Sequence, residues 1–513
     1  ITGVFTDISV RNRVMVTLIY ALGTLAFPFS TVFYGHQLAA SVSIISFYIL
    51  LKLKTGGGKE SYLLLLLSGF LAGYAFLSDY PAGISMVLLG IYALIVLRRK
   101  SAIIPWMIGV ALPVGFFLYY NNVCFGSPFV SSYSLHQTYS HSKGLLGITW
   151  PALDALWGIT FSSYRGIFYQ SPVLLFALPG FYLFHRRREY RAEFGLSLLV
   201  VLGFFFFNSG YAYWDGVGSV GPRFLIPAIP FLILPLVRSA KKWPLPVALL
   251  GVLSIIIMLV VTATEPRAEW KVRSPVFYFS FFLFLKGYLA ENLGALFGMK
   301  KIAGILPLLI FFLAAFLSLV WITRDSVRRK ISREKLLPSF GLLGIVLLWL
   351  IVAGWEEPCL QEFDKAESLF RYYRGRGDIR WSEVEGYYNR AIKADPGFLD
   401  PYLRLAEIAR MRGRPRMALA HYKRLSHLYP GLVLLHQEMA ITYDQLGETA
   451  KAEDELLLTI ELSPKNAFLR NQLAAFYIEK GRRDEAIAQW EKSLRINPGD
   501  KKIQMRLDNS PIK

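Results

Sequence analysis

The sequence has few charged residues and almost no cysteine. Only 18% of its 513 residues are charged, whereas about 25% is usual in soluble domains. Its two cysteines, Cys124 and Cys359, are too few for a disulfide framework and have no metal-ligand spacing. The chain opens with Ile1 and carries no signal peptide, so we expect residues upstream of it. These features exclude a small disulfide-bonded secreted domain.

Acidic residues are scarcest in the first two thirds of the chain. Residues 1–355 hold 30 Lys and Arg against 12 Asp and Glu, whereas residues 356–513 hold 26 against 24. Of the net charge of +20, +18 therefore lies in residues 1–355 and +2 in residues 356–513. The positive residues thus accompany the apolar runs that repeat from Val14 to Trp355, which argues against a nucleic-acid-binding face. We predict an all-α protein, with a membrane domain over 1–355 and a soluble tail over 356–513.

The apolar runs predict about 11 membrane spans, each near the 20 residues that cross a bilayer. The predicted spans are residues 14–33, 36–51, 61–77, 81–97, 102–120, 168–184, 194–208, 223–237, 244–262, 302–322 and 337–355. Alternate connections collect Lys and Arg, which marks them as cytoplasmic. The Phe-rich segment 276–285 then lies in the outer interface without crossing. This topology predicts a multi-pass protein of the bacterial inner membrane, with its tail in the periplasm or outside the cell.

The tail has an internal period of 34 residues. Prolines at 396, 430, 464 and 498, glycines at 413, 447 and 481, and Ala418, Ala452 and Ala486 each recur at this interval. The spacing and residue types resemble the tetratricopeptide repeat, a helix-turn-helix unit. We expect three full repeats, an earlier one from about residue 362 to Pro396, and a cap after Gly499. Stacked units of this kind form a groove for peptides or partner proteins, although a plain spacer is the alternative.

Polar and aromatic residues of the membrane part gather where spans meet the predicted outer surface. None of its acidic residues lies in the middle of a predicted span, which argues against a proton-coupled transporter. Four segments stand out: YGHQ at Tyr34, SDYP at Ser78, the loop from NNVCFGSPF at Asn121 to FSSYRGIFYQSP ending at Pro172, and YWDGVGSVGPRF from Tyr213 to Phe224. We expect a site at this outer interface.

These segments resemble those of bacterial polytopic glycosyltransferases of the GT-C fold, related to the protein O-mannosyltransferase and aminoarabinose transferase group. FPFSTVFYGH, YNNVCFGSPF, RGIFYQSP with ALPG, and WDGVGSVGPRFLIPAIPF carry the resemblance, over about residues 14–322. It implies an inverting transferase that passes a sugar from a polyprenyl-phosphate donor to a protein, glycan or lipid acceptor. In that family the base is an Asp in the first outer loop, which here would precede residue 1.

The chemistry requires a carboxylate for the acceptor proton and a cation, or a divalent metal such as Mg²⁺ or Mn²⁺, for the leaving phosphate. The candidate catalytic residues in this chain are Asp79 and Asp215. The candidate substrate-binding residues are Arg223, Arg165, His36, Tyr34, Asn121 and Trp214. Each also has an ordinary structural alternative. The acids can serve as a helix cap or turn residue, the arginines can contact lipid headgroups, and the aromatics can belong to an interfacial belt. His36 can be only hydrogen-bonded at a helix end, and Asn121 can close a turn.

Two rival functions remain open at this stage. A ligase or polymerase that moves oligosaccharides from polyprenyl diphosphate also combines many spans with a large outer loop. Residues 120–168 contain one Arg and one Lys, fewer than paired diphosphate recognition favours. The other rival is a non-catalytic membrane scaffold whose repeats bind partner proteins.

Overall fold

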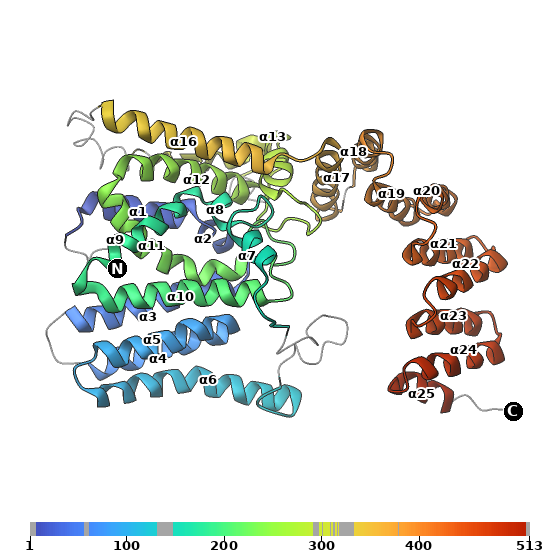
Figure 1. The fold of residues 1–513 in the computed structure, drawn as a ribbon, viewed down its shortest axis with the longest axis horizontal. Helices are drawn as coiled ribbons and strands as arrows, with labels where there is room; N and C mark the ends of the chain where they lie inside the picture. Colours follow the sequence, from blue (N-terminus) through green and yellow to red (C-terminus); the bar gives the residue numbers. More distant parts are fainter. Residues whose placement is uncertain are drawn as a thin grey trace. The chain divides into compact units, whose positions relative to one another are not determined.

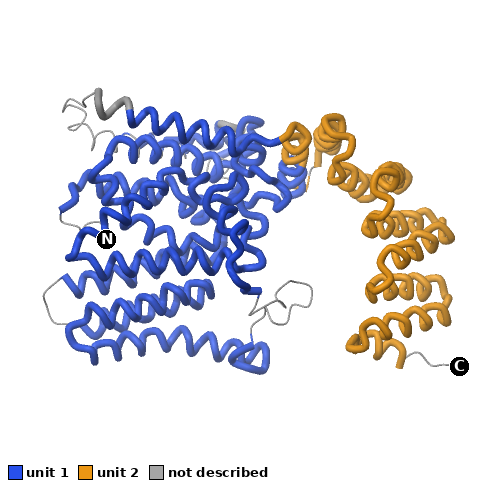
Figure 2. The backbone as a smooth tube through the Cα atoms, viewed as in Figure 1, with its two compact units in different colours: residues 1–356, 367–375 blue, residues 357–366, 376–513 orange. Residues whose placement is uncertain are grey.

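The computed structural model describes residues 7–55, 61–130, 147–290, 297–299, 301–307, 333–377 and 379–508, with a few residues between 309 and 317. Within these residues the chain is helical and forms no strand beyond the isolated bridge of Ile148 with Tyr211. The predicted all-α class is therefore confirmed. The chain divides into two compact units, unit 1 (residues 1–356 and 367–375) and unit 2 (residues 357–366 and 376–513), which Figure 2 colours separately.

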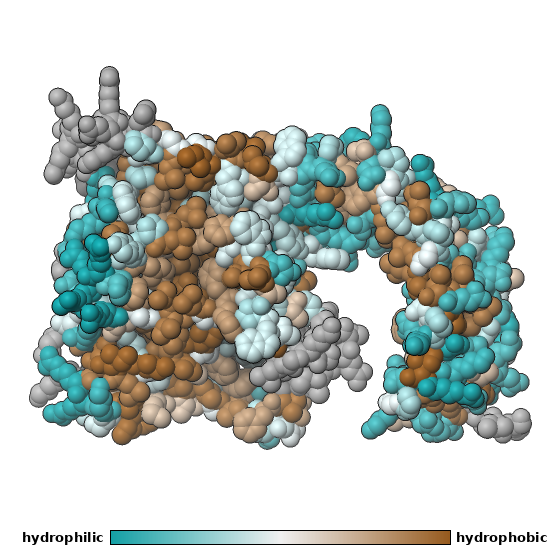
Figure 3. Space-filling model, in the orientation of Figure 1, coloured by the Kyte–Doolittle hydropathy of each residue, from teal (hydrophilic) through white to brown (hydrophobic). Residues whose placement is uncertain are grey.

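Unit 1 is a bundle of apolar helices (Figure 1). At its centre, every residue of α11 from Ile229 to Ala240 is buried. At its margin, α6 exposes Met107, Leu112 and Phe116, and the apolar surface of unit 1 is broad in Figure 3. Exposed apolar surface of this extent suits lipid better than water. The helices are α1 (Val10–Gly23), α2 (Ala26–Ser30), α3 (Gly35–Thr55), α4 (Tyr62–Ser78), α5 (Gly83–Val96), α6 (Ile103–Phe125), α7 (Leu153–Thr160), α8 (Ile167–Gln170), α9 (Ala177–His185), α10 (Arg191–Gly210), α11 (Ile229–Lys242), α12 (Pro244–Thr264), α13 (Phe282–Leu285) and α16 (Arg333–Gly354).

In the described part of the chain, 5 helices are long and apolar enough to cross a membrane, or 6 if the pair Pro338–Gly354 and Pro358–Arg374, bent by 85°, counts as one. The five are Gly35–Thr55, Lys100–Phe125, Arg188–Gly210, Arg223–Lys242 and Pro244–Thr264, and each coincides with a predicted span. The predicted spans 61–77, 81–97 and 168–184 fall on shorter apolar helices.

Two other predicted spans, and the segment predicted not to cross, are less regular. Span 14–33 is divided between α1 and α2, because the backbone is extended at Thr24. Ten of the 21 residues of span 302–322 lie outside the described residues. Segment 276–285 forms a π-helix, Pro275–Phe281, followed by α13. The total of about 11 spans therefore stays a prediction.

Small residues allow α4 and α6 to pack closely. A β-carbon at Gly69 would overlap the carbonyl of Trp106, and one at Gly109 would overlap the carbonyl of Leu66. On the other side of α4, the Ser46 and Ser68 hydroxyls lie 2.9 Å apart and both are buried. Such small residues and internal hydroxyl pairs are typical of helix contacts in membranes.

Unit 2 is a stack of helix pairs with the predicted period. Gly413, Gly447 and Gly481 follow the first helix of successive pairs, with φ of 67°, 74° and 74°, a conformation that ends helices and favours glycine. Ala418, Ala452 and Ala486 are fully buried on the second helices. The tetratricopeptide-like repeat is therefore confirmed. Its helices are α17 (Pro358–Arg374, shared with unit 1), α18 (Trp381–Ala394), α19 (Leu399–Met411), α20 (Pro415–Leu428), α21 (Val433–Gln445), α22 (Thr449–Leu462), α23 (Ala467–Glu479), α24 (Arg483–Ile496) and α25 (Lys501–Asp508).

The first and last helices of unit 2 complete the stack. Val384, Tyr388 and Ala391 of α18 are buried, and Phe363 packs against Tyr388 with ring centroids 5.8 Å apart. At the other end α25 buries Ile503. Both cysteines of the chain are free thiols.

Candidate functional site

The structure pairs two residues that the sequence placed on separate outer turns. His36 lies in the first turn of α3, and Asp79 directly follows α4. The His36 Nδ1 and the Asp79 Oδ2 are 2.7 Å apart, and the two side chains are 10% and 9% exposed. Gly35 permits this approach, because a β-carbon there would overlap the carbonyl of Ser78. A carboxylate held this way orients the imidazole ring.

Arg223 and His36 share two aromatic neighbours. The Arg223 guanidinium carbon lies 4.9 Å from the Tyr34 ring centroid and 5.1 Å from that of Phe224. The His36 ring lies 6.0 Å from Tyr34 and 5.2 Å from Phe224. We call these five residues (Tyr34, His36, Asp79, Arg223, Phe224) the His36 group. Among the described residues the buried Nε of Arg223 has no hydrogen-bond partner, which is compatible with an anionic ligand.

Arg165, Asp215 and Trp214 come together in a second group, through Tyr164. The buried Arg165 donates from Nε to the Asp215 carbonyl at 2.8 Å and stacks 3.8 Å over the Tyr164 ring. Tyr164 donates to the Asp215 carboxylate at 2.9 Å, and its ring meets Trp214 at 6.2 Å. These contacts hold the loop after α10 in place, so they give Arg165 and Asp215 a positioning role. Their roles toward a phosphate or an acceptor stay predictions.

The glycine-rich bend links the two groups. Gly216, Val217 and Gly218 all have positive φ, of 74°, 27° and 73°, and Val217 is strained in that region. A β-carbon at Gly216 would come within 3.2 Å of the Arg223 Cγ. The bend therefore lies against the Arg223 side chain.

Sequence reasoning missed the supporting residue Gln170. This buried side chain donates from Nε2 to the carbonyl of Val220, inside the bend. A lone amide within the apolar segment IFYQ was the signal that could have found it, because buried amides need partners.

Asn121 stands apart from both groups. It is 1% exposed and donates to the Pro128 carbonyl at 3.3 Å, which closes the end of α6. In the part of the chain that the structure describes, no group of three or more His, Cys, Asp or Glu is arranged to hold a metal ion. His36 with Asp79 supplies only two such side chains.

Unit 2 carries a separate candidate surface along α21, α23 and α25. Leu434 and Phe468 are 34 residues apart, as are Ile441 and Ala475, so they occupy equivalent positions of successive repeats. Leu434, Ile441, Phe468, Ile478 and Met505 are all exposed, and we call these five residues the first-helix face. Beside it is a hollow of about 570 Å³, which is lined by Ala475, Ile478, Glu479, Trp490, Lys502, Met505 and Arg506.

No family model matches this chain. It is 24% identical over 129 residues, 25% of its length, to the anaphase-promoting complex subunit CDC16 of Saccharomyces cerevisiae, and the match spans 15% of that protein. Among solved structures it is similar to YrrB, described as a TPR protein with an unusual peptide-binding site (16% identity, 34% of this chain and 87% of that chain, TM-score 0.24). It is also similar to TTC0263, a thermophilic TPR protein of Thermus thermophilus (25% identity, 34% and 92%, TM-score 0.23). None of these three is described as a transferase, and the repeat assignment rests on the chain's own period and helix pairs.

Proposed function

We propose that this chain is a membrane protein whose repeat array binds a partner protein and holds it at the membrane surface. The observation that supports this function is the first-helix face. Its five large apolar side chains recur on first helices and on α25, and all five are exposed. Side chains of this size outside a core commonly serve as anchors in protein interfaces.

The surroundings of the face indicate what kind of segment fits it. Lys502 and Arg506 line the hollow together with Glu479, so cations outnumber anions at its rim. Apolar walls with a basic rim favour a segment in which an apolar side chain is flanked by acidic residues.

Site-specific photo-crosslinking in native membranes tests this function. A photoreactive residue at Phe468 or Met505 should give a discrete crosslinked product, and Phe468→Asp should abolish the product formed from position 505. Leu457 and Leu462 of α22 are also exposed and serve as matched controls on a second helix. Equal crosslinking from both sets of positions, or none from the first-helix face, would refute partner binding there.

The His36 group supports a second function, that of a glycosyltransferase with a polyprenyl-phosphate sugar donor. In this proposal the acceptor hydroxyl attacks the anomeric carbon as the bond to the donor phosphate breaks. The His36 imidazole, oriented by Asp79 at 2.7 Å, accepts the hydroxyl proton. Arg223 binds the leaving phosphate, which departs with the bonding electrons. No step is assigned to a metal, because the described residues offer no three-ligand set.

The transferase proposal is tested with full-length protein and radiolabelled polyprenyl-phosphate sugar. Arg223→Ala should lower kcat/KM by roughly 30-fold, as expected when a charge-assisted hydrogen bond of about 2 kcal/mol is lost. Arg267→Ala is the control, because this arginine pairs with Glu265 at 2.7 Å and its side chain is 52% exposed. Unchanged transfer by Arg223→Ala would rule out its phosphate role, and no transfer by the wild type would leave the scaffold as the function.

Both functions share a proposed topology, in which unit 1 crosses the plasma membrane and the repeats lie on the non-cytosolic side. The alternation of basic connections supports this arrangement. A tag after residue 508 should react with a membrane-impermeant reagent added to intact cells. A tag that reacts only after the membrane is opened would reverse the orientation.

A further inference from the structure

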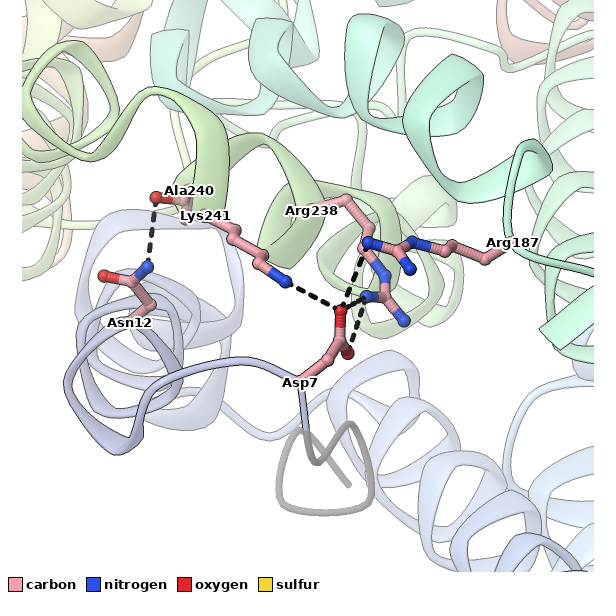
Figure 4. Close-up of polar contacts among 6 residues, drawn as sticks. All are labelled: Asp7, Asn12, Arg187, Arg238, Ala240 and Lys241. Atoms are coloured by element: carbon pink, nitrogen blue, oxygen red, sulfur yellow. Dashed lines mark hydrogen bonds and ion pairs between the residues drawn. The ribbon is translucent and has the colours of Figure 1, made fainter. Parts of the chain in front are cut away.

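A cluster of cations in unit 1 surrounds one carboxylate, that of Asp7 (Figure 4). Arg238 donates from Nη1 to both Asp7 oxygens at 2.8 Å, and Lys241 donates to Oδ2 at 2.9 Å. Arg187 lies 3.7 Å from the same oxygen. We call these four residues (Asp7, Arg187, Arg238, Lys241) the Arg238 cluster. One guanidinium nitrogen therefore donates charge-assisted hydrogen bonds to both oxygens of the anion.

The cluster is built by packed helix ends. Arg238 and Lys241 lie in the last turns of α11, and Arg187 follows α9. A β-carbon at Gly180 of α9 would overlap the Pro235 carbonyl of α11, so the two helices are in close contact. At the start of α1, Asn12 donates to the Ala240 carbonyl at 3.2 Å. The three cations therefore converge because rigid elements place them there.

The charges of the cluster do not balance. Three cations face one carboxylate, and the Arg187 and Lys241 side chains remain 46% and 42% exposed while that of Arg238 is 3% exposed. Burial acts to raise the pKa of Asp7, but hydrogen bonds from Lys241 and Arg238 outweigh burial and hold the pKa below its ordinary value. Asp7 is therefore ionised at neutral pH, and the cluster still carries an excess of positive charge.

Two aromatic residues, Tyr190 and Trp243, lie close to basic side chains in this region. Tyr190 lies 4.9 Å from the Arg238 guanidinium, and Trp243 follows α11 with Lys242 4.6 Å from its ring. Tyr and Trp collect at headgroup depth, and basic pockets between helix ends there attract anionic lipids. The exposed cations Arg187 and Lys241 lie at the end of an apolar helix, where a headgroup would reach them.

We propose that the Arg238 cluster binds the phosphate group of an anionic phospholipid, and that Asp7 occupies the site when no lipid is bound. A phosphodiester, like a carboxylate, offers two oxygens and a single negative charge, so it can accept the same hydrogen bonds from the Arg238 Nη1. Asp7 belongs to the segment before α1 and is 26% exposed, so an incoming lipid displaces one side chain and not a packed core. This proposal rests on the membrane placement of unit 1 and is independent of both functions proposed above.

The test measures binding of phosphatidylglycerol to the purified full-length chain in neutral detergent, by native mass spectrometry. Asp7→Asn keeps all three cations and removes the internal anion, so affinity should rise roughly fivefold, the effect of one charge at the surface. Arg238→Gln should lower affinity by at least as much. Lys52→Gln is the control, because it removes an exposed cation of α3 outside the cluster. Its affinity should stay within about twofold of the wild type, and this difference measures the general effect of surface charge.

A second variant and two comparison ligands complete the test. If Arg238→Gln fails to fold, the double variant Arg187→Gln with Lys241→Gln changes only half-exposed side chains and should weaken binding. Phosphatidylcholine and inorganic phosphate are the comparison probes. Equal affinity of the wild type, Asp7→Asn and the cation variants would overturn the site. Competition by inorganic phosphate at the concentration of the lipid would overturn the lipid as its ligand.

Discussion

The two units use polar and apolar residues in opposite ways. In unit 1 the buried Glu193 carboxylate accepts hydrogen bonds from Lys54 and from Tyr92, each at 2.6 Å, while α6 exposes apolar side chains. In unit 2 the Arg482–Glu453 pair is 35% and 20% exposed, and the core between the helix pairs is mainly apolar. The difference teaches that the surrounding solvent, and not helix content, decides which residues point inward.

The largest effect is expected where unit 1 depends on close helix approach. Gly109→Leu should destabilise the protein by about 3 kcal/mol, because its side chain would have to displace the backbone of α4. Gly115→Leu lies on the same helix, where a β-carbon meets nothing within 4 Å, and should be tolerated. The yield of monodisperse protein and its thermal unfolding in detergent measure both variants.

Equal effects of Gly109→Leu and Gly115→Leu on stability would contradict the contrast between a packed and an exposed face of α6. If Gly115→Leu destabilises as much as Gly109→Leu, the exposed face of α6 is also a packed interface and does not face lipid. If neither variant destabilises, α4 and α6 are not in the close contact that Gly69 and Gly109 imply.

Sequence reasoning succeeded where structure repeats locally and failed where partners are remote. The 34-residue period predicted the helix pairs of unit 2, because each repeat contacts mainly its neighbours. Hydropathy located the long helices of unit 1 but not their neighbours. His36 and Asp79 are 43 residues apart in the sequence, and Asp7 and Arg238 are 231 apart. These pairs could not be predicted, because an apolar run does not indicate which other helix it contacts. The burial of Arg165 and its hydrogen bond to the Asp215 carbonyl likewise cannot be read from a single sequence.

The repeat array itself should show opposite effects at two glycines. Gly447→Ala should destabilise unit 2 by about 1 kcal/mol, because alanine is strained at the left-handed φ of 74°. Gly386→Ala, inside α18 with open space around it, should stabilise by up to about 1 kcal/mol through helix propensity. Hydrogen exchange of the α18–α22 amides in the full-length chain measures both. Effects of the same sign would contradict the glycine-capped repeat.

The smallest effect tests the ion pairs that join neighbouring repeats. Glu453 of α22 accepts hydrogen bonds from Arg482 at 2.9 Å and from Tyr477 of α23 at 2.8 Å. The hydrogen bond from Arg482 lowers the pKa of Glu453 below its ordinary value. Because the folded pKa is the lower one, this pair stabilises the fold above the unfolded pKa of about 4.3, and its contribution is lost as the pH falls through the folded pKa.

Glu453→Gln should therefore cost about 0.5 kcal/mol at pH 7, a value kept small because the pair is partly solvated. The difference from the wild type should shrink toward zero under acid conditions, since protonation of Glu453 then removes the same charge in the wild type. Glu448→Gln at the N-cap of α22 is the control, because its partner Lys451 is 60% exposed, and it should change stability little at any pH. A cost for Glu453→Gln that does not vary between neutral and acid pH would mean that shape, and not charge, couples these repeats. Unit 2 would then resemble unit 1, where close packing of backbones holds the helices together.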